Sequence, residues 1–275
     1  MPRRVAVVAD SACDLPPEVA ATEGIALVPL TVAFGATSFL DGVELSPDAF
    51  WERVDRGDEH PTTASPSPRA LIEAWAAAGG GGEAVVSVHL SSKLSRTVET
   101  ARAAAPEADV PVEVVDSRSV SMGQGLVAMA AARAASLDAG PAEVAGAARD
   151  AATRLTVGAI LETVEFLRRG GRVGRAKAAM SDLLRIRPIL ALEEGEPVLA
   201  GRARTRRRAV DDVLEGVAGP AEAAAVFHAR APDADEVARR VREATSVEPL
   251  VGPIGPVTGS HLGPGALGIA VIARP

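Results

Sequence analysis

Short apolar segments with the character of β-strands alternate with helical segments along nearly the whole chain of 275 residues. Apolar runs bounded by turn residues predict strands, and the pairs Ser46-Pro47 and Ser67-Pro68 predict helix starts. The expected strands cover residues 5–9, 25–32, 84–90, 112–115, 157–161, 189–192, 198–203, 223–228, 250–251 and 267–272. Strands that alternate with helices are typical of an α/β fold with mostly parallel sheets.

Two alanine-rich helical segments, residues 122–137 and 141–155, follow one another without a strand between them. The alternation restarts at residue 157, so this interruption predicts a junction between two α/β domains, residues 1–155 and 156–275. In the second domain, Glu194-Gly195-Glu196 separates two strand candidates and predicts a hairpin. Further helices are expected at residues 164–169, 175–184, 206–217, with Thr205 as its cap, and 233–244.

Composition and length exclude several classes of protein. The hydrophobic share of 47% is too high for a disordered chain, and no apolar run approaches the ~20 residues of a membrane-spanning helix. No signal peptide precedes the strand that begins at Val5, so we expect a cytoplasmic protein. The single cysteine, Cys13, excludes an internal disulfide, and four scattered histidines show no metal-binding spacing, so we expect no metal and no other cofactor.

Charge is distributed unevenly along the chain. The formal net charge of −7 argues against a general nucleic-acid binder. Between Arg168 and Arg208, however, twelve basic residues stand against four acidic ones, a net charge of +8. Such a basic segment suits an anionic partner, such as a phosphate or a carboxylate. Solvated helix faces are the alternative explanation, and charge alone does not decide between the two.

Hydroxyl side chains gather in two loops that follow expected strands, at residues 62–67 and 91–95. In open α/β sheets, ligands bind beyond the carboxyl ends of the strands, and helix starts offer unpaired N–H groups to anions. The two loops therefore predict a site for a small anion. Ser and Thr also cap helices for stability alone, so plain capping is the alternative for each loop.

Motifs of catalysis are few. The chain has no G-x-S-x-G nucleophile elbow, no G-x-x-x-x-G-K-[ST] loop and no G-x-G-x-x-G after the first strand. Cys13 follows a strand, where a lone cysteine is more often a small buried apolar residue than a nucleophile. Glycines near His261 would let a ligand approach its backbone, although a turn histidine with a satisfied ring is an equal explanation. These observations favour a binding protein over an enzyme.

Six short blocks of residues follow one another in a set order along essentially the whole chain. They are Val8-Ala9-Asp10-Ser11 with Asp14-Leu15, Pro61-Thr62-Thr63 with Pro66-Ser67, Ser91-Ser92-Lys93-Leu94-Ser95 with Thr97, Val115-Asp116-Ser117 with Gly123 and Gly125, Leu167-Arg168-Arg169-Gly170-Gly171-Arg172, and Gly255-Pro256-Val257 with residues 261–268. In this order the blocks resemble the DegV family, the bacterial fatty-acid-binding proteins whose FakB members serve a fatty acid kinase. Each block is weak alone, and the six together are specific.

The resemblance implies two α/β domains that hold one long-chain fatty acid in a tunnel between them. It also implies that the carboxylate is bound by hydroxyls of the two loops and by the histidine of the last block. The candidate ligand-binding residues are Thr62, Thr63, Ser65, Ser92, Ser95 and His261. Burial of an acyl chain of about 16 carbons, at roughly 0.8 kcal/mol per CH₂ group, gives a gross gain on the order of 12 kcal/mol.

Two positions depart from the family pattern. Ala64-Ser65 stands where the family often has Ser-Gln, which removes one polar contact. Arg96 replaces the usual glycine after Ser95 and places a cation beside the expected anion site, where it strengthens carboxylate binding or points outward.

The resemblance also implies a protein partner. In the family, a kinase meets the binding protein and phosphorylates the bound acyl carboxylate, so this chain is expected to have no catalytic residue of its own. We expect Arg172, Arg202 and Arg204, within the basic segment, to contact the kinase or the acyl phosphate. Nucleic acid is not an expected partner, and membrane contact is expected to be transient at most.

Two other functions stay open at this point. One is a stand-alone acyl hydrolase or acyl transferase that uses Ser95 or Cys13 together with His261. The other is a regulatory protein in which a bound lipid has a structural role.

Overall fold

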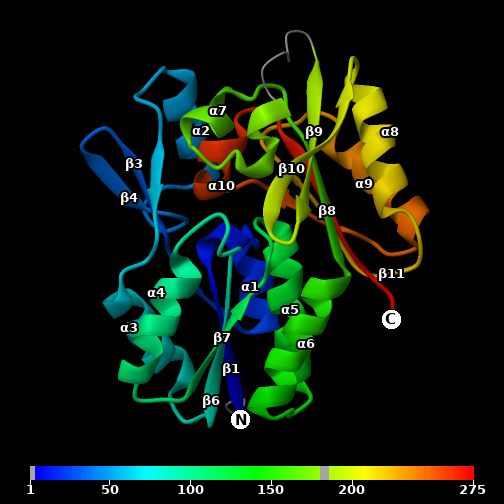
Figure 1. Cartoon of the computed structure of the whole chain (residues 1–275). Helices are drawn as coiled ribbons and strands as arrows, with labels where there is room; N and C mark the ends of the chain where they lie inside the picture. Colours follow the sequence, from blue (N-terminus) through cyan, green and yellow to red (C-terminus); the bar gives the residue numbers. More distant parts are fainter. Residues whose placement is uncertain (1–3, 180–185) are drawn as a thin grey trace.

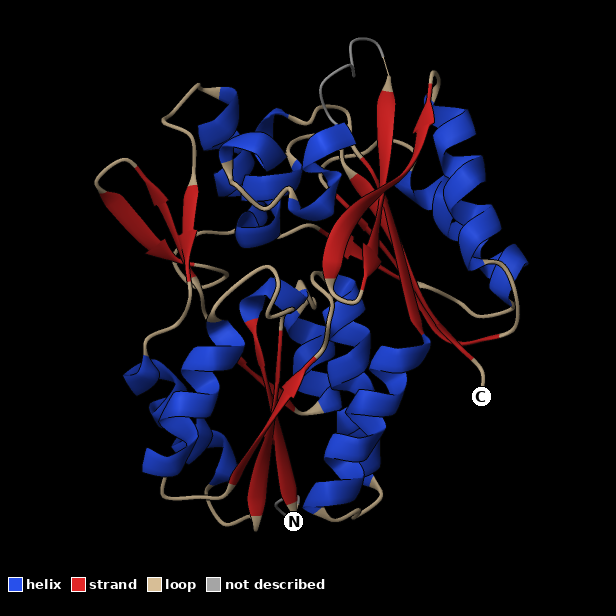
Figure 2. Cartoon of the chain, viewed as in Figure 1, coloured by secondary structure: helices blue, strands red, loops and turns tan. Residues whose placement is uncertain are grey.

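The computed structural model of the chain describes residues 4–179 and 186–275. One half is built around a four-stranded sheet in which all pairs are parallel (Figure 1). Its strand order is β2 (Ile25–Val28), β1 (Val5–Asp10), β6 (Ala84–His89) and β7 (Val112–Asp116). Helices cover both faces, with α3 (Pro68–Gly79) and α4 (Thr97–Ala104) on one side and α5 (Met122–Ser136) and α6 (Pro141–Arg154) on the other (Figure 2). Because both faces are covered, all residues of β6 are buried.

A six-stranded sheet forms the other half. Its strand order is β10 (Glu196–Ala203), β9 (Arg187–Glu193), β8 (Leu155–Ile160), β13 (Leu267–Ala273), β11 (Ala221–His228) and β12 (Leu250–Pro253). Among the described strands, β11 and β12 pair in parallel and the other neighbours pair antiparallel. Helices α8 (Arg206–Val217) and α9 (Ala234–Thr245) lie against this sheet.

The α/β class is confirmed, but the prediction of mostly parallel strands is correct only for the four-stranded sheet. A helix makes its flanking strands parallel when it returns the chain along the whole strand. Helix α9 does this between β11 and β12. Among the described residues, the connection from β8 to β9 contains two short helices, α7 (Glu165–Arg169) and η3 (Gly174–Ala179). The five residues of α7 rise by about 7.5 Å, less than half the ~20 Å of a six-residue strand. Strands β9 and β10 are joined by the predicted hairpin, which makes them antiparallel.

A third sheet consists of three short antiparallel strands, β4 (Thr37–Leu40), β3 (Thr31–Phe34) and β5 (Thr62–Ala64). The sequence predicts one strand over residues 25–32, whereas the structure divides this segment into β2 and β3 around Pro29. Strand β5 lies in a segment that the sequence presents as a loop. This pairing matters for the site because neighbouring residues of a strand face opposite sides.

Most expected helix boundaries agree with the structure. Ser46, Ser67 and Thr205 each accept a hydrogen bond from the backbone three residues on and so cap α2 (Pro47–Asp55), α3 and α8. Shorter helices are η1 (Ser11–Cys13), α1 (Pro17–Glu23), η2 (Ala105–Glu107), η3 (Gly174–Ala179) and α10 (Pro256–Leu262). The helix expected at residues 175–184 lies partly outside the described residues. In residues 4–179 and 186–275, no helix is long and apolar enough to cross a membrane.

Helix α5 connects the two large sheets. It contacts β1 of the four-stranded sheet and β11 of the six-stranded sheet, and it is therefore buried on nearly all sides. The predicted domain boundary between residues 155 and 156 falls at the start of β8, and this division of the chain stays a prediction.

A cluster of buried polar side chains joins the end of β1 to α10. Asp14 has a left-handed backbone conformation (φ 51°) and accepts a hydrogen bond of 2.5 Å from Ser121 Oγ. Its other carboxylate oxygen lies against Gly255, the residue before α10, because a Cβ at Gly255 would be 2.6 Å from it. Burial, together with the nearby charge of Asp41, raises the pKa of Asp14 to about 8.

We expect the substitution Asp14→Asn to change how stability depends on pH. The pKa of Asp14 is about 8 in the folded protein and 3.8 ordinarily, so between these values the folded state keeps a proton that the unfolded chain has lost. This contribution to stability is therefore lost as pH rises through the range. The carboxamide does not titrate, and Asn tolerates a left-handed backbone. The variant's Tm, measured relative to wild type, should rise from pH 5 to pH 8; a constant or falling difference would contradict this assignment.

Candidate ligand-binding site

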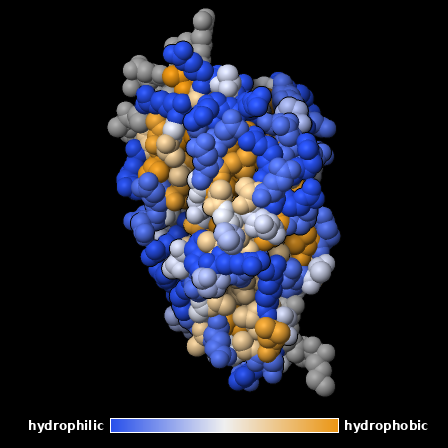
Figure 3. Space-filling model, turned by 90° about the vertical axis from the view of Figure 1, so that its right-hand side faces the viewer, coloured by the Kyte–Doolittle hydropathy of each residue, from blue (hydrophilic) through white to orange (hydrophobic). Residues whose placement is uncertain are grey.

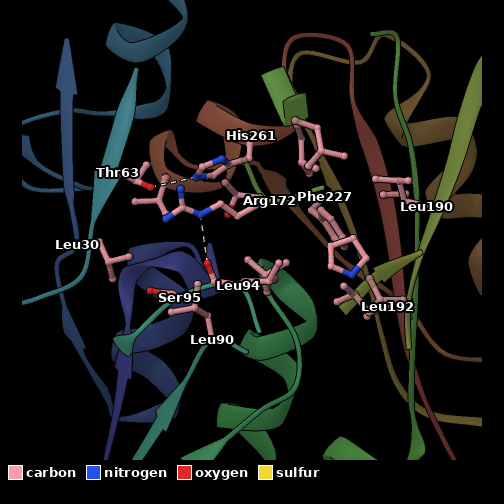
Figure 4. A pocket seen from close by; sticks show the side chains of 18 of the residues that line it. Leu30, Thr63, Leu90, Leu94, Ser95, Arg172, Leu190, Leu192, Phe227 and His261 are labelled. Carbon is pink, nitrogen blue, oxygen red and sulfur yellow. Dashed lines mark hydrogen bonds between the residues drawn. The ribbon is translucent and has the colours of Figure 1, made fainter. Parts of the chain in front are cut away.

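A cavity of about 280 Å³ is lined by residues of the three-stranded and six-stranded sheets, of the loops that follow β6 and β7, and of α7 and α10. Figure 4 shows the lining side chains, which are mostly aliphatic at one end and polar at the other. The large apolar ones include Leu30, Leu90, Leu94, Leu190, Leu192 and Phe227. A cavity with this division of surface suits a ligand that has an apolar body and a small polar group.

The floor of the cavity is a row of residues across the six-stranded sheet. Phe227 of β11 is paired with Gly268 of β13, Gly268 with Ala159 of β8, and Ala159 with Leu190 of β9. Gly268 has no room for a side chain, since a Cβ there would lie 2.2 Å from the ring of Phe227. The ring of Phe227 therefore lies over Gly268, and Ala159, which also lines the cavity, is the small residue between Phe227 and Leu190.

Thr63 and His261 meet at the polar end of the cavity. Oγ1 of Thr63 lies 3.0 Å from Nε2 of His261, as the dashed line in Figure 4 shows. Strand β5 holds Thr63 in place by pairing it with Val32, and α10 carries His261 near its end. Both side chains line the cavity, so the structure brings together two residues that are almost 200 positions apart in the sequence.

The imidazole of His261 is neutral at physiological pH. Burial, together with the nearby charge of Arg172, lowers the pKa of this ring to about 4. Its Nδ1 atom is buried and has no hydrogen-bond partner among the described residues. Because an unpaired buried N–H is rarer than an unpaired acceptor, this favours the proton on Nε2, which then donates to Thr63. The hydroxyl proton of Thr63 is then available to a ligand.

A short chain of hydroxyl groups lies nearby. Ser65 Oγ is 3.0 Å from Ser95 Oγ, which is 2.9 Å from Thr97 Oγ1. Thr97 begins α4, and its backbone N–H donates to Ser95 Oγ at 3.3 Å. Hydroxyl donors beside the start of a helix suit a small anion because the helix end carries partial positive charge. The two loops predicted to form an anion site thus meet in the structure.

Two guanidinium groups, those of Arg96 and Arg172, also line the cavity, and both residues are exposed. Arg172 donates from Nε to the carbonyl of Leu94 at 3.3 Å and from Nη1 to the carbonyl of Gly170 at 2.8 Å. It therefore links two segments across the polar end (Figure 4). None of the described lining residues is Asp or Glu, so the polar end carries net positive charge.

Two candidate hydroxyl residues do not line the cavity. Thr62 precedes Thr63 on β5, so it faces the opposite side of the strand, where it is exposed. Ser92 turns toward β7 and donates a hydrogen bond of 2.6 Å to Asp116 Oδ2. The structure thus separates Thr62 and Ser92 from the residues that meet at the polar end.

The basic segment from Arg168 to Arg208 carries less unbalanced charge than its sequence indicates. Within the described residues, ion pairs join Arg169 with Glu165, Arg175 with Glu193, Arg187 with Glu162, Arg206 with Asp233, and Arg208 with Asp212. Most of these carboxylates lie outside the segment, where a count of the segment's own charges misses them. Arg202 on β10 and Arg204, which directly follows this strand, are exposed, and neither lines the cavity.

The residues of the alternative enzymatic site are not assembled. Cys13 is fully buried, burial raises the pKa of its thiol well above the usual range, and it does not line the cavity. Ser95 contacts Ser65 and Thr97, whereas His261 contacts Thr63. Within the described parts of the chain, these residues therefore form no pair of nucleophile and base.

A buried chain of hydrogen bonds, not predicted from the sequence, lies beneath the loop after β6. His89 is 2.9 Å from Asp10 Oδ2 through Nδ1 and 2.8 Å from Ser87 Oγ through Nε2. All three side chains are 0% exposed, and Trp75 also donates to Ser87, so this chain does not meet substrate. Asp10 accepts the backbone N–H of Leu90 at 3.0 Å and so fixes the start of the loop. The sequence signal that could have predicted this chain was the presence of two polar residues, Ser87 and His89, in the otherwise apolar strand β6.

A family model described as an uncharacterised protein of the DegV family matches residues 4–274. A DegV domain-containing protein of Streptomyces coelicolor is 36% identical over 283 residues and covers 100% of both chains. Another, from Mycobacterium tuberculosis, is 37% identical over 276 residues, which cover 97% of this chain and 96% of the relative.

Solved structures agree with these matches over nearly the full length. One is a DegV family protein from Thermus thermophilus, whose structure is described as showing fatty acid binding. It has a TM-score of 0.89 at 30% identity, and the match covers 98% of this chain and 100% of the Thermus thermophilus chain. DegV from Bacillus subtilis, described as a fatty acid binding protein, has a TM-score of 0.89 at 30% identity, covering 99% and 100%. The likeness includes the whole fold that forms the cavity.

The neutral state of His261 can be checked by an NMR titration of its ring. We expect a midpoint near pH 4, well below the ordinary 6.5, because the ring is buried and near a cation. Arg172→Met should raise the midpoint by removing the charge, and Arg204→Met, a control away from the cavity, should not. A wild-type midpoint near 6.5 would contradict the buried, neutral imidazole.

Proposed function

This chain belongs to the DegV family, and we propose that it binds one long-chain fatty acid in the cavity and presents the acyl carboxylate to a partner kinase. The observation that carries the proposal is the composition of the cavity. Its apolar end consists of side chains such as Leu190, Leu192 and Phe227, and its polar end has hydroxyls, a neutral imidazole and two guanidinium groups. The solved relatives from Thermus thermophilus and Bacillus subtilis, described as binding fatty acids, support the same ligand class.

The polar end has the properties that a carboxylate needs. An ion that leaves water must recover its hydrogen bonds, or its burial is costly. Thr63 and Ser95 supply hydroxyl donors, and Arg96 and Arg172 supply positive charge. A nearby Asp or Glu would repel the ligand, and the described lining has none.

The proposal divides the chain into an N-terminal domain, residues 1–155, and a C-terminal domain, residues 156–275, with the acyl chain between them. Residues from both parts line the cavity, for example Ser95 from the first and His261 from the second. This explains why neither part alone offers a complete site.

The kinase partnership rests on the chemistry at the polar end. Among the described residues, Ser95 and His261 contact different partners there, which is consistent with a carboxylate that a second protein modifies. Arg172 is exposed at the cavity and can meet both the carboxylate and a phosphoryl group. Arg202 on β10 and Arg204 just after it are exposed and belong to the proposed kinase-docking surface.

Membrane contact in this proposal is transient, because the ligand must be collected from or delivered to lipid. The face of the molecule in Figure 3 is mostly hydrophilic with smaller apolar areas. Over the described residues, the large apolar side chains that are well exposed are Leu40, Val43, Leu137 and Val251. The proposed location is the cytoplasm.

Calorimetric titration with palmitate tests the ligand and the site together. Thr63→Ala and Ser95→Ala each remove one donor to the carboxylate, so we expect binding to weaken by about 5- to 30-fold, or about 1–2 kcal/mol. The matched controls are Thr62→Ala, next to Thr63 on β5, and Ser92→Ala, in the same loop as Ser95. Each removes a hydroxyl group that does not line the cavity. Wild-type protein that binds neither palmitate nor oleate would refute the ligand; equal losses in controls and cavity variants would refute the site.

The kinase proposal is tested by acyl phosphate formation with a purified fatty acid kinase. Arg172→Ala should reduce the rate by about tenfold, since a charge-assisted contact to the phosphoryl group is lost. Arg202→Ala with Arg204→Ala should raise the KM for the binding protein. Arg240→Ala, a control whose side chain pairs with Asp211 on the far side of the sheet, should leave the rate unchanged. No acyl phosphate from ligand-loaded wild type would contradict the partnership.

A further inference from the structure

The hairpin of β9 and β10 spans from the six-stranded sheet to the four-stranded one. Its tip, which we define as Glu194 and Gly195, contacts the loops that follow β6 and β7. Ser91 Oγ donates to the carbonyl of Gly195 at 2.7 Å, and Arg118 Nη1 lies 2.9 Å from Glu194 Oε2. Figure 1 shows the turn between β9 and β10 directed toward the end of the four-stranded sheet.

The hairpin tip fits closely against these loops. Gly195 has a left-handed backbone conformation (φ 79°), and a Cβ there would lie 2.4 Å from Ser91 Oγ. The same Cβ would lie 3.4 Å from the Cβ of Arg118. A glycine is therefore required for this approach, and the contact is specific in its geometry.

The hairpin tip lies along a seam in the apolar wall of the cavity. On one side of the seam, Leu90 and Val120 line the cavity. Leu90 directly precedes Ser91, and Val120 lies two residues after Arg118. On the other side, lining residues of β9 and β10 flank the tip. Movement of the hairpin tip away from Ser91 and Arg118 would therefore open the apolar end directly to the outside.

The polar contacts of the tip with other described residues are few, and they are weak. One of them is a single hydrogen bond, and the other is an ion pair whose side chains are 55% and 81% exposed and hence weak. Strand β10 is at the edge of its sheet and pairs only with β9 in the described structure. Its pairing is irregular between Leu199 and Gly201, a point at which the hairpin can flex.

We propose that the hairpin tip is the gate for the acyl chain: it leaves Ser91 and Arg118 when a fatty acid enters or leaves, and it closes again over the bound tail. This inference rests on the proposed function, since it assumes an acyl ligand. The links from Thr63 to His261 and from Arg172 to Leu94 hold the polar end together. The hairpin tip is therefore the part of the cavity wall that moves in this proposal.

The double substitution Arg118→Cys with Gly195→Cys tests the gate. A separation of 3.4 Å between the two Cβ positions is close to the ~3.5–4.5 Å of disulfides, so oxidation should join the tip to the β7 loop. The native Cys13 is buried and does not compete. Exchange of bound deuterated palmitate for excess unlabelled palmitate, followed by native mass spectrometry, should slow by about tenfold or more on oxidation and recover on reduction. Equal exchange rates in the two forms would overturn the proposal.

A second variant avoids the strain that a side chain at residue 195 introduces. Ser91→Ala with Arg118→Ala removes the hydrogen bond and the ion pair described for the tip, and it should speed palmitate exchange severalfold. The control is Arg4→Ala, which breaks an exposed ion pair at the other end of β1. Exchange at the wild-type rate would overturn the gate even if the disulfide does not form. Wild-type protein without bound palmitate would instead contradict the proposed function, so the two failures are distinguishable.

Discussion

The loop between β6 and α4, residues 90–96, is the element on which the rest of the site depends. Its backbone is held at Leu90 by the buried carboxylate of Asp10, and at Leu94 by the guanidinium of Arg172. Because partners from distant parts of the chain converge on one loop, the side chain of Ser95 has a fixed position beside Ser65 and Thr97. A loop without these partners would present the same hydroxyls in many arrangements, at an entropic cost on binding.

The charge state of the polar end follows from burial. The imidazole of His261 is neutral because it is buried, and the hydroxyls of Thr63 and Ser95 are neutral at any physiological pH. The positive charge comes from exposed guanidinium groups, which stay hydrated until a ligand arrives. An anion therefore gains hydrogen bonds inside the cavity and charge balance at its mouth. This division binds a carboxylate without creating a buried, unpaired cation in the empty protein.

Sequence reasoning was successful where local chemistry decides the outcome. Helix starts at Ser46, Ser67 and Thr205 follow from capping, which involves neighbouring residues only. The two hydroxyl loops were singled out from their place after strands, and their serines meet in the structure, while the anion site itself stays a prediction. The family blocks supplied His261, whose contact with Thr63 no local pattern reveals.

The remaining features depend on pairing between distant segments. Thr63 rather than Thr62 faces the cavity because β5 pairs with β3, and Ser92 turns away because Asp116 of the next strand accepts its hydrogen bond. The antiparallel order of the six-stranded sheet could not be predicted, since alternation of elements says nothing about how far each connection travels. For the same reason, the +8 segment looked more positive than it is, because its partners, such as Glu162 and Asp233, lie elsewhere.

The central claim is that the acyl tail lies on the six-stranded sheet with its carboxylate at the hydroxyl end. A crystal structure of the protein with palmitate measures this most directly. The account predicts carboxylate oxygens within hydrogen-bonding distance of Thr63 Oγ1 and Ser95 Oγ, and the tail against Phe227 and Leu190. Density for palmitate elsewhere, or with its carboxylate at the apolar end, would contradict it.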